Sequence, residues 1–472
     1  MALCARPHHS TSATGLLRPS VPAALIGNLL AVTGGMPSIE GDRYLHPEIE
    51  TMARADIEAI QEEKLLDLIP YAYERSALTR ATWEEAGVHP RDIKSLDDFR
   101  ERAPFVSKDA IRVFRDERGD PYGGLLCFKE SELTAITSTS GTTGDPTLVP
   151  EVWGGAREGT TPALVREFYE IGTRPGDYFT CILFTFRGAF FAMVQSLGAI
   201  PVFLDHTPTE LRRFVELSLE LRPTNLYNFS NVLISELAHV CEAMLVDPRE
   251  VMSSYHGVVH GGEPLGMRSR KLLEEWGVEG FEHTAVGDAS AATECREHDG
   301  CHFWEDGVLV EHLDPDGTDT MRDGERGELV VTALDNRTMP LVRFRSDDLA
   351  DITRKQCGCG RTHGRIKTAG RKGDEVIVDG RSVLPMDVWE AVERFDETAM
   401  GLFQIIRTAS KMDTLRLRVG HDGSTKKEGE LSDRIAEAVS EATGVIPEVE
   451  LVPNDDLLRL GPPHKIPRVA KK

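Results

Sequence analysis

The chain has 472 residues, more than one ordinary hydrophobic core contains, and this length predicts two or three domains. With 40% hydrophobic and 28% charged residues it has a globular composition, which excludes disorder over most of its length. A net charge of −23 argues against nucleic-acid binding, because most of the surface would repel phosphate backbones. No apolar run reaches the ~20 residues of a membrane-spanning helix, so we expect a cytoplasmic protein without a membrane partner.

Residues 1–39 differ from the rest of the chain, since they contain no Asp or Glu and the first acid is Glu40. This composition predicts a disordered extension, and Met36 is an alternative start of the native protein. A targeting segment is the second interpretation, although no convincing cleavage site follows its apolar stretch.

The body of the chain alternates helical and β-rich patterns. Apolar residues recur at helical spacing from Pro47, and further helices are predicted at residues 209–221 and 232–244. Short β-rich runs occupy residues 178–184 and 199–204. This alternation predicts a large α/β domain with packed sheets, at residues 40–370.

A second pattern begins after Gly370, where the chain turns polar. Strands are predicted at residues 376–378, 415–419 and 448–452, and helices at 386–395 and 431–442. These elements are sufficient for a separate α+β domain, and we place it at residues 371–472.

A hydroxyl-rich loop is the most informative motif. Residues 137–147 read Thr-Ser-Thr-Ser-Gly-Thr-Thr-Gly-Asp-Pro-Thr, and such a loop can surround polyphosphate oxygens with hydroxyl and backbone N–H donors. The common loops G-x-x-x-x-G-K-[ST] and G-x-G-x-x-G are absent from the positions that would identify them. A plain surface turn is the alternative, but it would not explain the ordered motifs that follow.

With these later motifs, the loop resembles that of the acyl-adenylate-forming superfamily, and in particular its phenylacetate–coenzyme A ligase-like family. The phosphate-loop match comprises Ser140, Gly141, Thr142, Thr143 and Gly144. A second run resembles the adenine-contacting turn and contains Gly262, Glu263 and Pro264. A third resembles the segment whose Asp holds the ribose hydroxyls, and here that residue is Asp348.

The resemblance extends into the small domain, which the family rotates between its two half-reactions. Gly370-Arg371-Lys372-Gly373-Asp374 resembles the hinge, with a pivot near Gly373 and Arg371 among the nucleotide-binding residues. Gly380 matches the lining of the family's thiol tunnel. Lys465 matches the lysine that promotes adenylation. The resemblance therefore implies a large multi-sheet adenylation domain followed by a small mobile domain.

One motif departs from the family pattern. Ser290-Ala291-Ala292-Thr293-Glu294 matches Y-G-x-[ST]-E, which gives Thr293 a contact to the α-phosphate and Glu294 a Mg²⁺ ion. Ser290 stands where an aromatic residue stacks on adenine, a contact that contributes on the order of 1 kcal/mol. The phosphate chemistry is thus better supported than the identity of the base.

The reaction implied is activation of a carboxylic acid by ATP, followed by transfer to coenzyme A. Lys465, Mg²⁺ and the phosphate loop would neutralise charge in the first step. Aromatic residues around residues 184–188 and 227–229 favour an aryl or arylacetic acid. A carrier-protein thiol, a nitrogen nucleophile, a nitrite-using diazotase of aromatic amines and a non-catalytic nucleotide-binding regulator stay open as alternatives, as does a homodimer.

Four of the eight cysteines fall between residues 295 and 359, which suggests a metal site. A Cys₃His set favours tetrahedral zinc, here a structural Zn²⁺ ion. We assign Cys295, His302, Cys357 and Cys359, with His298 and Cys301 as competing ligands. Reduced buried cysteines are the alternative.

Overall fold

The structure, a computed structural model, describes residues 43–138, 147–152, 155–183, 185–409, 411–461 and 466–471. The predicted extension at 1–39 lies outside these residues. So do the predicted phosphate-loop residues Ser140, Gly141, Thr142, Thr143 and Gly144, and the predicted lysine Lys465. Across the described ranges, no helix combines the length and the apolar character needed to cross a membrane.

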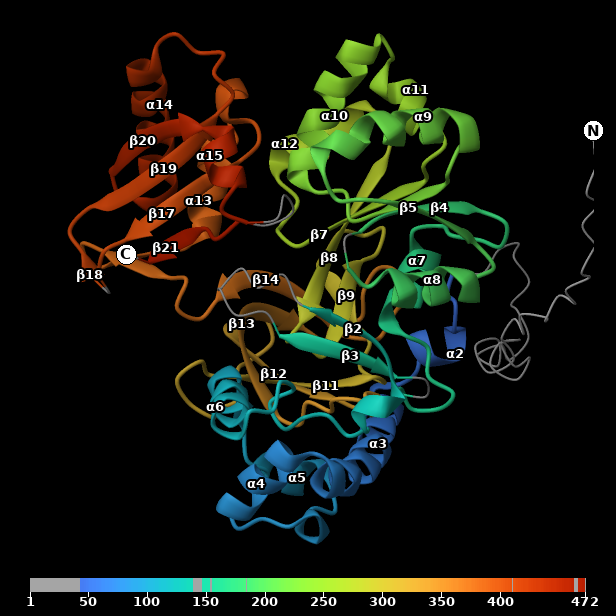
Figure 1. The fold of residues 1–472 in the computed structure, drawn as a ribbon. Coiled ribbons are helices and arrows are strands. Elements are labelled where there is room, and N and C mark those ends of the chain that lie inside the picture. Colours follow the sequence, from blue (N-terminus) through green and yellow to red (C-terminus); the bar gives the residue numbers. More distant parts are fainter. Residues whose placement is uncertain are drawn as a thin grey trace, which may run out of the picture.

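A twelve-stranded sheet runs through the large domain (Figure 1). Its first half is parallel, in the order β5 (Ile200–Leu204), β4 (Tyr178–Ile182), β6 (Asn225–Tyr227), β7 (Gly257–Gly261) and β8 (Glu279–Val286). The second half is antiparallel and continues through β9 (Ser290–Glu294), β10 (Cys301–Phe303), β14 (Arg365–Arg371), β13 (Phe344–Thr353), β12 (Arg326–Ala333) and β11 (Val308–Leu313). Strand β1 (Val106–Ser107) pairs with β13, and β2 (Leu133–Ser138) pairs separately with β3 (Leu148–Val152).

Helices bury both faces of the parallel half. One core packs the sheet against α9 (Leu211–Leu221), α10 (Asn231–Met244), α11 (Pro248–Met252) and α12 (Met267–Glu275). Helices α7 (Ala163–Glu170) and α8 (Arg187–Ser196) cover a second core, which is rich in aromatic residues. The region before β2 contributes α2 (Pro47–Glu50), α3 (Arg54–Arg75), α4 (Ala77–Glu85), α5 (Leu96–Arg102) and α6 (Lys108–Arg118). The predicted α/β character of the large domain is confirmed.

The small domain has a four-stranded sheet of β20 (Pro447–Pro453), β19 (Leu415–His421), β17 (Phe403–Arg407) and β21 (Val469–Lys471). A second sheet contains β16 (Arg381–Val383), β15 (Val376–Val378) and β18 (Lys411–Met412). Helices α13 (Pro385–Val392) and α14 (Glu428–Thr443) pack with these strands in one core, and α15 (Asn454–Leu458) follows β20. In Figure 1 this domain lies beside α12, at a distance from α3, α4 and α5.

Most predicted elements appear, with shifted ends. The predicted strand at 376–378 coincides with β15, and the helix predicted at 431–442 extends by about one turn to become α14. The continuous helix predicted from Pro47 is wrong in one detail, because the chain is extended at Ala53 and separates α2 from α3. Buried Glu50 explains this break, since its carboxylate pairs with Arg361.

The chain leaves the large sheet at Arg371 and enters a small-domain sheet at Val376. Between them Gly373 has a φ of 87°, a left-handed conformation that glycine adopts without strain. This change of sheet supports the predicted hinge near Gly373, while the domain boundaries themselves stay predictions. Proline could not replace Gly373 in this arrangement, because its φ is fixed near about −65°.

Candidate functional site

The predicted adenine turn follows β7, at the carboxyl edge where parallel sheets usually bind ligands. Gly262 has a φ of 93° and allows the chain to turn sharply there. Two side chains of the large domain hold this turn. Nε2 of His260 lies 2.7 Å from the Glu263 carbonyl, and Asn231 donates to the Pro264 carbonyl at 3.0 Å. Its backbone is therefore fixed before any ligand binds.

The predicted ribose ligand Asp348 faces Arg371 across the β13–β14 ladder. Nε of Arg371 lies 3.1 Å from Oδ1 of Asp348, and the Asp348 N–H donates to the Ser346 hydroxyl at 3.1 Å. Two residues that sequence resemblance linked to one nucleotide are thus adjacent in space. The guanidinium of Arg371 orients the Asp348 carboxylate through this contact.

The strands on either side of the predicted phosphate loop form a hairpin. Ser138 at the end of β2 pairs with Leu148 at the start of β3, so residues 139–147 join two adjacent strand ends. On the small domain, Gly380 has a φ of 76° and follows Asp379, with a φ of 48°, in the two-residue turn between β15 and β16. Positive φ at both central residues is typical of a type I′ hairpin turn.

Glu294 and Thr293 are both buried on β9. Oε2 of Glu294 accepts the Glu282 backbone N–H at 3.0 Å and lies 3.0 Å from Nδ1 of His298. Hydrogen bonds to Glu279 and then Glu294 raise the pKa of His298 to about 9, so its imidazolium donates to both acids at neutral pH. Oxygen Oε1 of Glu294 has no hydrogen-bond partner among the described residues.

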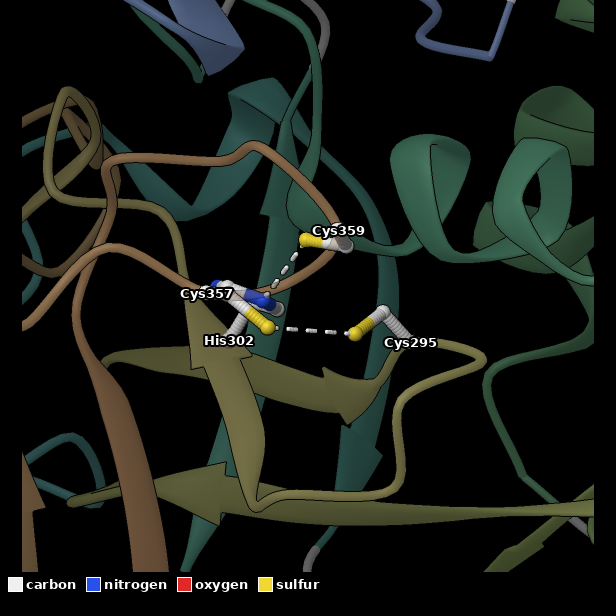
Figure 2. A group of neighbouring side chains, drawn as sticks. All are labelled: Cys295, His302, Cys357 and Cys359. Atoms are coloured by element: carbon white, nitrogen blue, oxygen red, sulfur yellow. Dashed lines mark hydrogen bonds between the residues drawn. The ribbon is translucent and has the colours of Figure 1, made fainter.

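Four candidate zinc ligands converge from three segments (Figure 2). The ligand atoms of Cys295, His302, Cys357 and Cys359 all lie within 4.8 Å of one another. Sγ of Cys295 is 3.7 Å from Sγ of Cys357, and Sγ of Cys359 is 3.4 Å from Nε2 of His302. A tetrahedral zinc ion with sulfur ligands at about 2.3 Å separates two sulfurs by about 3.8 Å. The donor set and its spacing both fit Zn²⁺.

The competing ligands point elsewhere. His298 contacts Glu279 and Glu294, and the Cys301 thiol donates to the Glu282 carbonyl at 3.5 Å. His302 has its Nδ1 3.2 Å from the carbonyl of His363, which directs Nε2 into the cluster. A hydrogen bond from Cys295 and the neighbouring His302 lower the pKa of Cys359, which favours the thiolate that zinc binds.

Sequence reasoning missed the buried Arg361, which lies two residues after Cys359. Its guanidinium lies 2.8 Å from Glu50 and 2.6 Å from Glu170, and its backbone N–H faces the Cys359 sulfur at 3.5 Å. Nothing local in the sequence indicates this role, because Glu50 precedes Arg361 by 311 positions. The arginine therefore connects the loop that carries Cys357 and Cys359 to α2 and α7.

The other thiols lack the environment of a nucleophile. Burial raises the pKa of Cys127 to about 12 and also raises that of Cys181. A thiol that stays protonated at neutral pH is a poor nucleophile. Both therefore behave as buried apolar residues.

The predicted acyl pocket is divided by the fold. Phe229 is fully buried and stacks on Phe214 at 5.6 Å, so it belongs to the core. Arg187 pairs with Asp205. Tyr227 belongs to the other core, under α7 and α8, and its ring is 5.6 Å from that of His283. Phe184 lies outside the described residues.

His283 is a second residue that sequence reasoning missed. Its Nδ1 lies 2.9 Å from Oε2 of Glu167, whose side chain is completely buried. Its neighbours on the sheet are Gly261 in β7 and Thr293 in β9. This acid–imidazole pair therefore lies between the predicted adenine turn and Tyr227.

A cavity of about 760 Å³ lies elsewhere, between α2, α3 and residues 157–161. Its buried cation Arg166 makes two hydrogen bonds of 2.7 Å to Asp306, and Lys64 pairs with Asp335 at 2.8 Å. These charges satisfy each other, and none of the predicted site residues is among those that line the cavity.

A doubly covered parallel sheet, a following small domain and nucleotide-binding motifs at the sheet edge define an acyl-adenylate-forming enzyme. No family model matches the chain. The phenylacetate–coenzyme A ligase of Thermus thermophilus is 30% identical over 435 residues, which cover 86% of this chain and 95% of that protein. The chain belongs to the phenylacetate–coenzyme A ligase-like family, whose members are AMP-forming acid–thiol ligases.

Solved structures of a 2-hydroxyisobutyryl-CoA ligase in two states share the fold of this chain. Its postadenylation state, with the acyl-adenylate bound, matches with a TM-score of 0.78 at 27% identity, over 92% of this chain and 93% of that one. Its thioesterification state matches with a TM-score of 0.63 at 27% identity, over 91% and 93%. The chain therefore matches the postadenylation state of that ligase better than its thioesterification state.

Replacement of Arg361 tests whether it connects its own loop to α2 and α7. Arg361→Leu would leave Glu50 and Glu170 without their cation, and we expect the free energy of unfolding to fall by roughly 3–5 kcal/mol. Denaturant unfolding measures this loss. Arg394→Ala, which removes an exposed pair with Glu441, is the control and should cost at most about 1 kcal/mol. Equal effects of the two substitutions would contradict the role given to Arg361.

Proposed function

We propose that this protein activates an aryl or arylacetic acid with ATP and transfers the acyl group to coenzyme A. The observation that carries the proposal is the Asp348–Arg371 pair, in a chain whose curated relatives are phenylacetate–coenzyme A ligases. In the first half-reaction the carboxylate attacks the α-phosphorus of ATP and pyrophosphate leaves. In the second, the thiol attacks the acyl carbon and AMP leaves.

Each proposed role matches the chemistry of one part of the nucleotide. Asp348 accepts hydrogen bonds from the ribose hydroxyls, while the turn at Gly262, Glu263 and Pro264 borders the base. Ser140, Gly141, Thr142, Thr143 and Gly144 would bind the phosphates. Lys465 neutralises negative charge that develops during adenylation, where a fixed positive group is most effective. Thr293 and Glu294 would serve the α-phosphate and Mg²⁺, an ion that offsets phosphate charge when bound.

We assign the second half-reaction to the part of the small domain around the β15–β16 turn, which contains Gly380. Gly380 occupies a tight turn in which any side chain would be strained, so a pantetheine arm could pass close to its backbone. The aryl character of the acid is supported by the phenylacetate–coenzyme A ligase relatives and by buried aromatic residues such as Tyr227. The absence of nucleic-acid and membrane partners, the cytoplasmic location and the oligomeric state stay predictions.

Pyrophosphate exchange tests the proposal directly. Wild-type protein with Mg²⁺ should exchange labelled pyrophosphate into ATP in the presence of phenylacetate or a related aryl acid, and should form a thioester once coenzyme A is added. The panel should include 2-hydroxyisobutyrate, aromatic amines with nitrite, and a carrier protein as acceptor. A folded protein that exchanges pyrophosphate with none of the acids would contradict the proposal.

Glu294→Gln separates a magnesium role from a structural one. If Oε1 binds Mg²⁺, the variant should need roughly tenfold more Mg²⁺ for half-maximal exchange, as expected when a metal site is impaired. Its melting temperature should stay near that of wild type. Glu216→Gln, at an exposed position on α9, is the control. An unchanged Mg²⁺ requirement together with a lower melting temperature would make Glu294 a structural acid.

We also infer that Cys295, His302, Cys357 and Cys359 bind one structural Zn²⁺ ion. Support comes from the donor set, the 3.7 Å sulfur separation and the hydrogen bond that orients His302. With four protein ligands the ion has no open position, so it would serve stability rather than chemistry. It would tie the end of β9 and strand β10 to the loop between β13 and β14.

Metal analysis should find roughly one Zn²⁺ per chain, as expected of one four-ligand site. Cys357→Ser should lose the metal and lower the melting temperature. Cys301→Ser is a matched control in the same region and should keep the metal, because its thiol points to Glu282. Retention of zinc by Cys357→Ser, or an equal loss by both variants, would exclude this ligand set.

A further inference from the structure

The interface between the two domains contains a buried ion pair. Nε and Nη2 of Arg468 lie 3.0 and 2.8 Å from the two carboxylate oxygens of Glu263. Each side chain is only 11% exposed. Glu263 belongs to the predicted adenine turn of the large domain, and Arg468 belongs to the small domain, three positions after Lys465.

Contacts within the small domain also orient Arg468. Its Nη1 donates to the Gly401 carbonyl at 2.6 Å, and its guanidinium lies 3.9 Å from the centre of the Trp389 ring. Strand β21, which follows it, pairs with β17 of the same domain. Glu263 is therefore the partner that Arg468 would lose if the small domain rotated away.

A second contact depends on the same arrangement. Glu393, at the end of α13, is buried, and neither of its carboxylate oxygens has a hydrogen-bond partner among the described residues. Its carboxylate packs against Gly266 of the large domain, where an added Cβ would lie 2.1 Å from Oε1. Gly266 has an ordinary backbone conformation, with φ −60° and ψ 150°. A side chain at this position would therefore be allowed by the backbone but would require the Glu393 carboxylate to move.

The same interface includes smaller contributions. Arg268 of α12 pairs with Asp396 at 2.6 Å, and Val232 of α10 joins an apolar cluster with Leu402 and Ile466. These contacts occur in the arrangement that matches the postadenylation state better than the thioesterification state. The contacts of Glu263 and Gly266 thus belong to the first arrangement.

We propose that Arg468 and Glu263, together with the packing of Glu393 on Gly266, form an interdomain lock specific to the adenylate-holding arrangement. Arg468 is a positioning residue, because it acts through Glu263 by holding the small domain against the adenine turn. This inference rests on the proposed two-step function. It predicts that loss of the lock slows adenylation selectively.

Gly266→Ala is the sharpest probe, since one methyl group meets Glu393 only in this arrangement. We expect pyrophosphate exchange to fall roughly 10- to 100-fold, as when a buried interfacial contact is disrupted. Thioester formation from presynthesised acyl-adenylate and coenzyme A should stay within about twofold of wild type. Combination with Glu393→Ala should restore exchange, because the methyl group then has room. Arg394→Ala, at the exposed pair with Glu441, should change neither rate.

The pH profile offers a readout that simple destabilisation would not give. Burial raises the pKa of Glu393 to about 7, the nearby cation Arg468 lowers it in part, and the Glu263 carboxylate raises it further. The arrangement that buries neutral Glu393 is fully favoured below the ordinary pKa of the carboxyl group, and this preference is lost as pH rises through about 7. The ratio of adenylation to thioester formation should therefore fall across this range in wild type and stay flat in Glu393→Gln.

A measurement without substrate makes the lock testable even if the acid is not found. Spin labels on Leu245→Cys and Ile446→Cys, at positions 94% and 75% exposed on the two domains, report the interdomain distance. Arg468→Ala and Gly266→Ala should each shift this distance away from its wild-type value, and Arg394→Ala should not. Equal slowing of both half-reactions, or an unchanged distance in both variants, would overturn the lock. Absence of adenylation in wild type would instead overturn the proposed function.

Discussion

The buried guanidinium of Arg361 is the interaction on which the central region depends. Burial of a charge is costly unless partners surround it, and here two carboxylates do so from α2 and α7. Tyr44 adds a further contact, since its ring lies 5.1 Å from the guanidinium and its hydroxyl donates to the Cys359 carbonyl at 2.6 Å. Segments more than 300 positions apart in sequence are thereby held at one point.

This tie affects the nucleotide site through the strands that it connects. The loop that carries Cys357 and Cys359 joins β13 to β14, and these strands present Asp348 and Arg371. Cys295 follows β9, which carries Thr293 and Glu294. Arg361 and the cluster of Cys295, His302, Cys357 and Cys359 thus connect β9 to the end of the β13–β14 pair that lies away from Asp348 and Arg371. Such support fixes side-chain positions before binding and reduces the ordering that substrate must accomplish.

The sequence predicted elements where amphipathic periodicity was strong and failed where tertiary contacts decide. Helix α14 and strand β19 followed their apolar pattern closely. Strands β17 and β21 were missed, because each is short and depends on pairing with another strand, β17 with β19 and β21 with β17. The choice of His302 over His298 also needed the fold, since both histidines are near Cys295 in sequence and only one side chain turns toward the cysteines. The resemblance placed Glu263 near the base, but its side-chain partner lies 205 positions away and has no local signal.

Glu263 belongs to the turn that is proposed to border the base, and its carboxylate also contacts the small domain. Ser290 stands where the family has an aromatic residue that stacks on the base. On the proposed function, recognition of the base therefore rests more heavily on the backbone around Gly262 and Pro264. That backbone is held by His260 and Asn231 from within the large domain. The carboxylate of the same turn is held by Arg468 from the small domain. On the proposed function, Glu263 links the adenine turn to Arg468, so that docking of the small domain and binding of the nucleotide favour each other.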